Sequence, residues 1–151
     1  MQWKTILVPH DFSSSANHAA ALARDEAKLH GATLVLLHVI DLPIQFAPTT
    51  AIVPESTGAP ISISDYAVAS AEAHLEDLCA RLAQDGVKAT PYIRLGRPVD
   101  EINRFATEEA VDLIVMGTHG HTGIRAFIAG SVTERVVRTS NIPVLTVRHP
   151  D

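Results

Sequence analysis

Five short apolar runs, separated by segments with helical periodicity, constrain the fold of this chain more than any other feature of its sequence. The runs are Thr5–Val8, Thr33–Val39, Ala89–Arg94, Leu113–Met116 and Val144–Val147. Short, nearly unbroken runs of this kind are typical of strands buried on both faces of a parallel sheet. Because helical patterns lie between them, we predict a single doubly wound, Rossmann-like α/β domain over residues 1–151, with helices on both faces of the sheet.

Four helices are expected between these strands. The first carries a stripe of small residues and ends at Gly31, and the second carries an apolar stripe and ends near Gly86. The third begins at Pro98, a favourable first helical position, and the fourth begins at Ser131 and ends before Pro143. The two stripes are Ala16, Ala19, Ala20, Ala23 and Ala27, and then Val68, Ala71, Leu75, Leu78 and Leu82.

Composition and charge exclude several classes of protein. The net charge of -5 and the pI near 5.9 argue against a general nucleic-acid binder, which would present a basic face. The single cysteine, Cys79, excludes a disulfide framework within the chain. No apolar run approaches the ~20 residues of a membrane span. Met1 leads directly into a strand without a signal peptide, so a cytoplasmic location without membrane insertion is expected.

The segment Asp41–Ser64 interrupts the alternation of strands and helices. It contains Pro43, Pro48, Pro54 and Pro60 and has no clear period, so we expect a long flexible loop within the domain. One interpretation is a plain connector. The other is a flap over a ligand site, because the segment starts where the second strand ends, and open α/β sheets bind ligands at that edge. The second interpretation predicts that ligand binding orders the segment.

A glycine-spaced loop after the fourth strand is the strongest functional motif. It reads Gly117-Thr118-His119-Gly120, then nine residues, then Gly130-Ser131. Glycine lets the backbone approach a ligand closely, and the N-terminus of the following helix favours phosphate. Ser131 and Glu134 have the spacing of a capping box. Neither a G-x-G-x-x-G after the first strand nor a G-x-x-x-x-G-K-[ST] is present, so dinucleotide-binding and P-loop domains are excluded.

The first strand ends in Pro9-His10-Asp11-Phe12, followed by three serines. At this edge the Asp11 carboxylate could accept a hydrogen bond from a ribose hydroxyl, hold a metal, or serve only as an N-terminal helix charge. The serines could cap the helix or cradle a phosphate, and capping is favoured because a single serine suffices for it.

Four histidines, His10, His38, His119 and His121, could gather at the same edge. The chain has no H-E-x-x-H and no Cys/His spacing, so we expect no protein-bound metal site and leave the roles of His10, His38 and His121 open. A Mg2+ or Mn2+ ion held mainly by phosphates is the metal expected here.

The spacing G-x2-G-x9-G-[ST] resembles the ATP-binding motif of the universal stress proteins. The resemblance extends along nearly the whole chain, because Ile6–Pro9 with Asp11, Leu36–Val39, Gly96–Pro98, Asp112–Gly117 and Ile142–Leu145 are similar to further landmarks of that family. It implies a five-stranded parallel sheet of order 3-2-1-4-5 and a homodimer formed through the last strand, Val144–Val147. It also implies that the chain belongs to the nucleotide-binding members, which keep the glycine loop.

By this resemblance Asp11 contacts the ribose, while Val39 offers its backbone to adenine and Pro9 lines that pocket. Arg125, inside the nine-residue spacer, is either a ligand of a terminal phosphate or a solvated loop charge. The remaining residues implied in nucleotide binding wrap the sugar and phosphates, and they are Gly117, Thr118, His119, Gly120, Gly130, Ser131, Val132 and Thr133.

The function implied is that of an ATP-binding regulator of a stress response, with ATP, ADP or AMP and Mg2+ or Mn2+ as ligands and an unknown protein as partner. Slow ATP hydrolysis is an open alternative, although no catalytic residue is assigned. A protein-interaction module of the same fold with little nucleotide occupancy is another.

Overall fold

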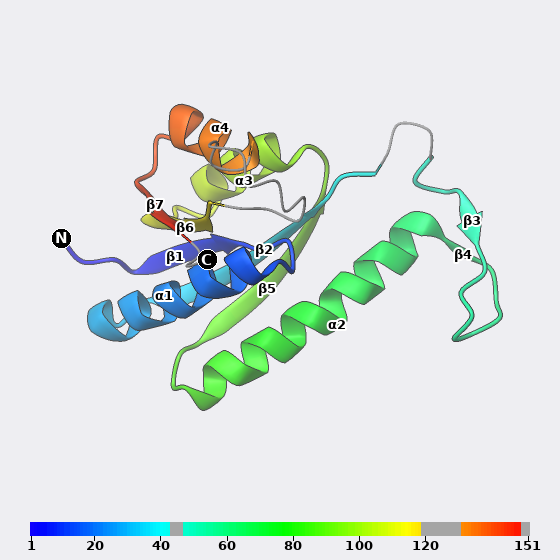
Figure 1. Cartoon of the computed structure of the whole chain (residues 1–151), viewed down its shortest axis with the longest axis horizontal. Helices are drawn as coiled ribbons and strands as arrows, with labels where there is room; N and C mark the ends of the chain where they lie inside the picture. Colours follow the sequence, from blue (N-terminus) through cyan, green and yellow to red (C-terminus); the bar gives the residue numbers. More distant parts are fainter. Residues whose placement is uncertain (43–46, 119–130, 149–151) are drawn as a thin grey trace.

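A computed structural model of the chain describes residues 1–42, 47–118 and 131–148 (Figure 1). Its main sheet has five parallel strands: β1 (Thr5–Pro9), β2 (Thr33–Ile40), β5 (Ala89–Leu95), β6 (Leu113–Gly117) and β7 (Val144–Val147). The spatial order is β5-β2-β1-β6-β7, which confirms the predicted order 3-2-1-4-5. Each observed strand lies within one residue of the apolar run that predicted it.

Helices cover both faces of this sheet (Figure 1). Helices α1 (Ser14–His30) and α2 (Ile63–Gln84) lie on one face, and α3 (Pro98–Glu108) and α4 (Ser131–Thr139) lie on the other. The start of α1 is capped by Ser13, whose hydroxyl accepts the Ala16 N–H at 3.1 Å. Gly31 ends α1 with a left-handed φ of 68°. Among the described residues, no helix combines the length and the hydropathy of a membrane span.

Alternate residues of each strand point into two separate cores. On β1, Ile6 and Val8 pack with α1 and α2, whereas Leu7 packs with α3 and α4. The first core includes the alanine stripe of α1, and the second is centred on fully buried Phe105 of α3. Burial on both faces explains why the strands read as unbroken apolar runs.

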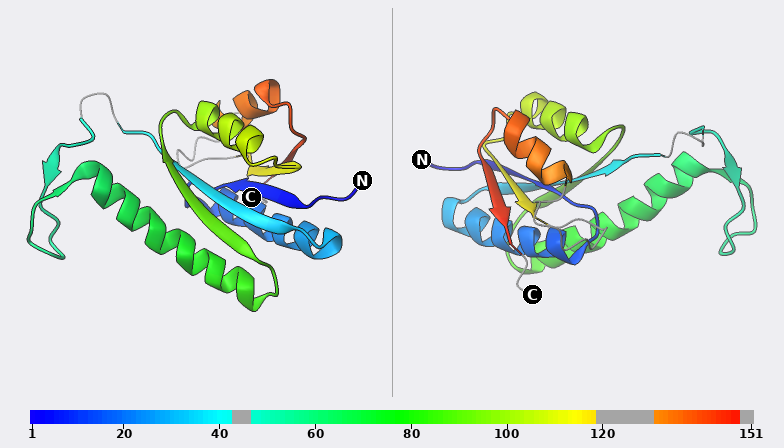
Figure 2. Two further views of the ribbon diagram at one scale, coloured as in Figure 1. Left: turned by 180° about the vertical axis from the view of Figure 1, so that it is seen from behind. Right: turned by 45° about the horizontal axis from the view of Figure 1, so that its top comes forward.

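Part of the segment predicted as a loop is ordered structure. Strands β3 (Ala51–Ile52) and β4 (Ile61–Ser62) form a small antiparallel sheet. Helix α2 starts at Ile63 because Ser62 caps it, accepting the Asp65 N–H at 3.1 Å. The β3–β4 sheet and the first turns of α2 extend beyond the main sheet in all three views (Figures 1 and 2). The flexibility of Asp41–Ser64 stays a prediction.

The end of β6 packs directly on the first turn of α1. A Cβ atom added to Gly117 would lie 2.7 Å from the carbonyl oxygen of Ser15, closer than atoms can approach without a shift. Ser15 itself is 3% exposed. Glycine at position 117 therefore allows α1 to start close to the sheet, next to the carboxyl ends of β1 and β6.

We predict that Gly117→Ala destabilises the fold. The new methyl group must displace backbone atoms of α1, and overpacking of this kind typically costs about 1–3 kcal/mol. The measurement is the free energy of unfolding from urea titration. A variant as stable as the natural chain, within about 0.5 kcal/mol, would show that β6 and α1 do not approach so closely.

Candidate functional site at the carboxyl edge of the sheet

The carboxyl ends of the parallel strands meet at one edge of the sheet. Strand order reverses there: β2 lies beside β1 on one side and β6 lies beside it on the other. Ligands of open α/β sheets bind in the crevice at this reversal. The structure brings seven of the predicted site residues to this edge, at or just after the ends of β1, β2 and β6 and in the first turn of α4: Pro9, Asp11, Val39, Gly117, Thr118, Val132 and Thr133.

Strand β2 continues past the end of β1 and leaves backbone groups without a strand beside them. The Leu37 carbonyl accepts the His10 N–H at 2.8 Å, so Leu37 pairs on the β1 side. Backbone groups alternate in direction along a strand, so the N–H and C=O of Val39 face that same side. Because β1 ends at Pro9, they point into the space beyond β1. The His10 carbonyl accepts a hydrogen bond from His38 Nδ1 at 2.7 Å instead.

Asp11 is tied to the start of α1 through one of its two oxygens. Its Oδ1 accepts the Ser13 N–H at 3.1 Å and the Ser13 hydroxyl at 2.5 Å. The Ser13 oxygen in turn accepts the Ala16 N–H, which confirms that a serine of this run caps the helix. The other oxygen, Oδ2, keeps its capacity to accept from a ligand. The carboxylate is therefore held in place by its own helix while one face stays open for recognition.

His10 is a buried structural residue of this edge. Its Nδ1 accepts the Phe12 N–H at 3.1 Å, so the ring proton sits on Nε2, which donates to Asn17 Oδ1 at 3.1 Å. Burial lowers the pKa of His10 below its ordinary value of 6.5, although the hydrogen bond to Asn17 opposes this shift. His10 is therefore neutral near pH 7, with both ring nitrogens in use.

Phe12 adopts a left-handed backbone conformation, with φ of 65°, which is unusual for an aromatic residue. Its ring centroid lies 4.5 Å from that of His38 and 5.0 Å from that of His74 on α2. The hydrogen bond from the Phe12 N–H to His10 Nδ1 stabilises this conformation. A strained backbone conformation of this kind persists only where surrounding contacts hold it in place. At Phe12 this conformation redirects the chain between Asp11 and the cap of α1.

The histidines of the described residues do not form a metal centre. His38 Nδ1 donates to a backbone carbonyl, and His10 has no free nitrogen. Within 1–42, 47–118 and 131–148, no group of three or more His, Cys, Asp or Glu side chains could hold a metal ion. His119 and His121 lie outside the described residues.

Two hydrogen bonds join the end of β6 to its neighbours at the edge. The Thr118 N–H donates to the Val147 carbonyl at 3.0 Å, and the Thr133 hydroxyl donates to the Gly117 carbonyl at 2.7 Å. The family resemblance implies that Thr133 is one of the residues around the sugar and phosphates of a nucleotide. In the structure its hydroxyl proton is donated to Gly117, so the donor that Thr133 has left for a phosphate is its backbone N–H.

Helix α4 presents its N-terminus to the same edge. The backbone N–H groups of its first turn, including those of Val132 and Thr133, have no partner within the helix because of helix geometry. Glu134, expected to close a capping box with Ser131, lies 2.8 Å from Arg138 in an ion pair. Gly120, Arg125 and Gly130 lie outside the described residues, as does His119, and Ser131 is placed only as the first residue of α4.

Sequence reasoning predicted a helix cap among the three serines, but it missed three contacts that organise the edge, made by Ser13, Ser15 and Asn17. Ser13 holds Asp11, Ser15 packs on Gly117, and Asn17 binds His10. The spacing of Asp11 and Ser13, a carboxylate two residues before a helix cap, is the one signal that could have indicated the first of these contacts.

The chain is similar to known proteins along nearly its whole length. The sequence matches the model of the universal stress protein family over residues 2–148. Universal stress protein MJ0577 of Methanocaldococcus jannaschii is 33% identical over 156 aligned residues, covering 98% of this chain and 96% of that protein. A universal stress protein of Thermus aquaticus is 36% identical, covering 97% of this chain and 99% of that protein.

Solved structures are similar over the whole chain. The structure of MJ0577 has a TM-score of 0.81 at 30% identity and covers 100% of this chain and 99% of its own. A universal stress protein in complex with cAMP has a TM-score of 0.71 at 25% identity, with 98% of each chain covered.

We predict that His10 makes stability depend on pH. A group whose pKa is lower in the folded state than in the unfolded state contributes stability above the unfolded pKa, here 6.5, and loses it as pH falls toward the folded value. Asp11, His38 and Arg81 also act electrostatically on this ring, so a comparison of the natural chain with a His10 variant measures their net effect together with that of burial.

The test compares urea unfolding of the natural chain and His10→Asn between pH 7.5 and 5. Asparagine keeps an acceptor for the Phe12 N–H and does not titrate, so the difference in unfolding free energy between the two proteins should shrink as pH falls. His10→Ala, which leaves that N–H unpaired, should cost about 1–3 kcal/mol at pH 7.5. A difference that stays constant with pH would contradict the neutral, buried state of His10.

Proposed function

Because this chain belongs to the universal stress protein family, we propose that it binds an adenine nucleotide at the carboxyl edge of its sheet and acts as a nucleotide-dependent regulator of a stress response. ATP with Mg2+ or Mn2+ is the proposed ligand, and ADP or AMP would use the same base and ribose contacts. The observation that carries the proposal is the pair of Val39 backbone groups beyond the end of β1, at the same edge as the Asp11 carboxylate.

The Val39 backbone suits the Watson–Crick edge of adenine. One strand residue offers an acceptor and a donor side by side, and adenine presents a donor, its 6-amino group, next to an acceptor, N1. Guanine presents the two in the opposite order. Because Asp11 holds the ribose and so fixes the orientation of the base, the order of donor and acceptor on the base edge decides the fit. Adenine should therefore be preferred over guanine.

The phosphates are proposed to lie at the start of α4. The free N–H groups and the dipole of that helix favour anions. The glycine spacing from Gly117 to Gly130 supports the same placement, because it allows close approach of a phosphate chain. The metal ion would be held by the phosphates, since carboxylates that could form a cage are not grouped among the described residues.

A regulatory role is favoured over catalysis by the partners of the acidic residues at this edge. Asp11 accepts two hydrogen bonds from Ser13, and Glu134 is paired with Arg138. Neither is arranged as a base that activates water. Slow hydrolysis would then reflect the bound metal and positioning alone.

A cytoplasmic location is part of the proposal. The single cysteine, the half-buried Cys79, and the nucleotide ligand both fit it.

We predict that the protein binds Mg-ATP more tightly than Mg-GTP, and that Asp11→Ala weakens ATP binding. Hydrogen bonds to a charged group are worth about 1.5–3 kcal/mol, so the loss should be about 10- to 100-fold in Kd. The measurement is isothermal titration calorimetry.

Asp25→Ala is the matched control. Asp25 lies on the exposed face of α1, toward the helix end that is remote from the carboxyl edge, and its variant should bind ATP as the natural chain does. Equal ATP affinity in the Asp11 and Asp25 variants would remove Asp11 from the site. Absence of any adenine nucleotide binding would favour the interaction-module alternative.

We also propose a homodimer through β7, an edge strand of the main sheet. The Thr118 N–H bonds to the Val147 carbonyl, so odd-numbered residues of β7 pair inward with β6. Val144 and Thr146 therefore present their N–H and C=O groups outward, and the side chain of Leu145 is 36% exposed. An unpaired apolar edge of this kind favours pairing with a second copy across a two-fold axis.

We predict that Thr146→Pro produces a monomer while Thr146→Ala does not. Proline removes the outward N–H of Thr146 but leaves the inward ladder to β6 intact, because odd-numbered residues make it. Sedimentation velocity at tens of micromolar protein is the measurement. A dimer that survives Thr146→Pro, or a natural chain that is monomeric, would rule out pairing through β7.

A further inference from the structure

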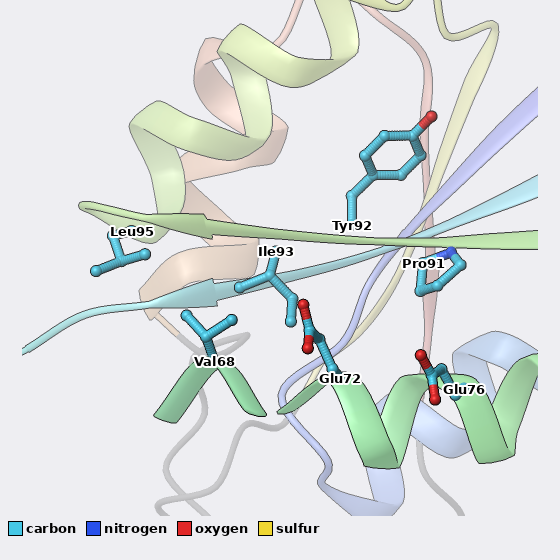
Figure 3. A pocket seen from close by; sticks show the side chains of 7 residues that line it. All are labelled: Val68, Glu72, Glu76, Pro91, Tyr92, Ile93 and Leu95. Carbon is cyan, nitrogen blue, oxygen red and sulfur yellow. The ribbon is translucent and has the colours of Figure 1, made fainter. Parts of the chain in front are cut away.

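A hollow of about 310 Å3 lies between α2 and β5, on the opposite side of β2 from the candidate nucleotide site (Figure 3). Val68, Glu72 and Glu76 line it from α2, and Pro91, Ile93 and Leu95 line it from β5. In Figure 3 the side chains of Pro91 and Ile93 point toward α2, whereas Tyr92 points to the other face of the strand. The floor is apolar and the α2 rim carries two carboxylates.

Strand β5 is an edge of the main sheet, and its outer backbone groups border this hollow. The Gly96 N–H donates to the Ile40 carbonyl at 3.0 Å, so even-numbered residues of β5 pair with β2. The N–H and C=O groups of Ile93 and Leu95 therefore face outward. Pro91 has no N–H, so the capacity to pair with a further strand is confined to the second half of β5.

The two carboxylates are uncompensated within the part of the chain that the structure describes. Glu72 and Glu76 are exposed and one helical turn apart, and no described Lys or Arg forms an ion pair with either. By contrast, Asp77 on the same helix lies 3.3 Å from Arg81. Leu95, at the Val68 end of the hollow, is 45% exposed. The hollow and the adjoining outer edge of β5, which we call the groove, thus combine unpaired backbone groups, an exposed apolar end and a negatively charged rim.

We propose that this groove binds an extended, basic segment of a partner protein as an added strand along β5. Residues four apart on a helix are separated by about 6 Å along its axis. Side chains two apart on a strand are separated by about 6.6 Å. Two basic side chains at positions i and i+2 of the segment therefore face Glu72 and Glu76, and an apolar side chain two residues farther along covers Val68 and Leu95.

A second copy of this chain does not fit that description. None of its 12 Lys and Arg residues lies two positions from another. The β3–β4 segment, which projects from the molecule, contains no Lys or Arg between residues 47 and 64. The net charge of -5 favours association with a basic segment. The occupant is therefore a different protein, recognised by main-chain pairing and two charges. This inference does not depend on the proposed nucleotide site.

The test uses a synthetic peptide, Val-Thr-Lys-Thr-Lys-Thr, capped at both ends, and the full-length protein labelled with 15N. Its control, Val-Lys-Lys-Thr-Thr-Thr, has the same charge and composition but places the two lysines on opposite faces of a strand. The alternating peptide should bind more tightly, and its titration should shift the amide signals of Ile93 and Leu95.

Glu72→Gln combined with Glu76→Gln should weaken binding of the alternating peptide about tenfold, as expected for two solvent-exposed ion pairs. Asp77→Asn is the control on the same helix and should leave the affinity unchanged. Equal binding of the two peptides would mean that only general charge attraction acts, which would overturn the proposal. Amide shifts confined to residues outside α2 and β5 would also overturn it, as would the absence of binding at millimolar peptide.

Discussion

The candidate site depends on one feature of strand register: β2 runs three residues beyond the residue that pairs with the end of β1. Pro9 is opposite Leu37, and β2 continues to Ile40. Had β1 continued alongside β2 to its end, the Val39 backbone would be paired and could not recognise a base. Instead, its N–H and C=O face the point where the strand order reverses. Three elements converge on that point: the turn after β1, the end of β6 and the N-terminus of α4.

The turn after β1 is held by a set of local contacts, each of which supports the next. His10 is buried and neutral, and it fixes the left-handed Phe12 through a backbone hydrogen bond. Phe12 directs the chain into Ser13, which caps α1 and binds Asp11. Gly117 lets α1 begin close to the sheet. Asp11 is therefore positioned before any ligand arrives, so little conformational entropy is lost on binding.

The sequence predicted the main sheet well because buried parallel strands carry continuous apolar runs. It missed the β3–β4 sheet and assigned no start to α2. The first turns of α2 project beyond the main sheet, so no core selects an apolar period there, and only the cap at Ser62 marks the start. At the site, residue type did not distinguish a glycine that a ligand needs from one that packing needs. Gly117 shows packing against Ser15, and the Thr133 hydroxyl binds Gly117 rather than remaining free to donate.

In the proposed site, Val39 recognises the base through its backbone. The most direct measurement is a titration of the 15N-labelled protein with AMP and with Mg-ATP, followed through the amide signal of Val39. We expect a large shift of this signal with both ligands, because both carry adenine, and additional shifts at the start of α4 with ATP alone. Binding of either nucleotide without a change at Val39 would rule out recognition of the base by its backbone.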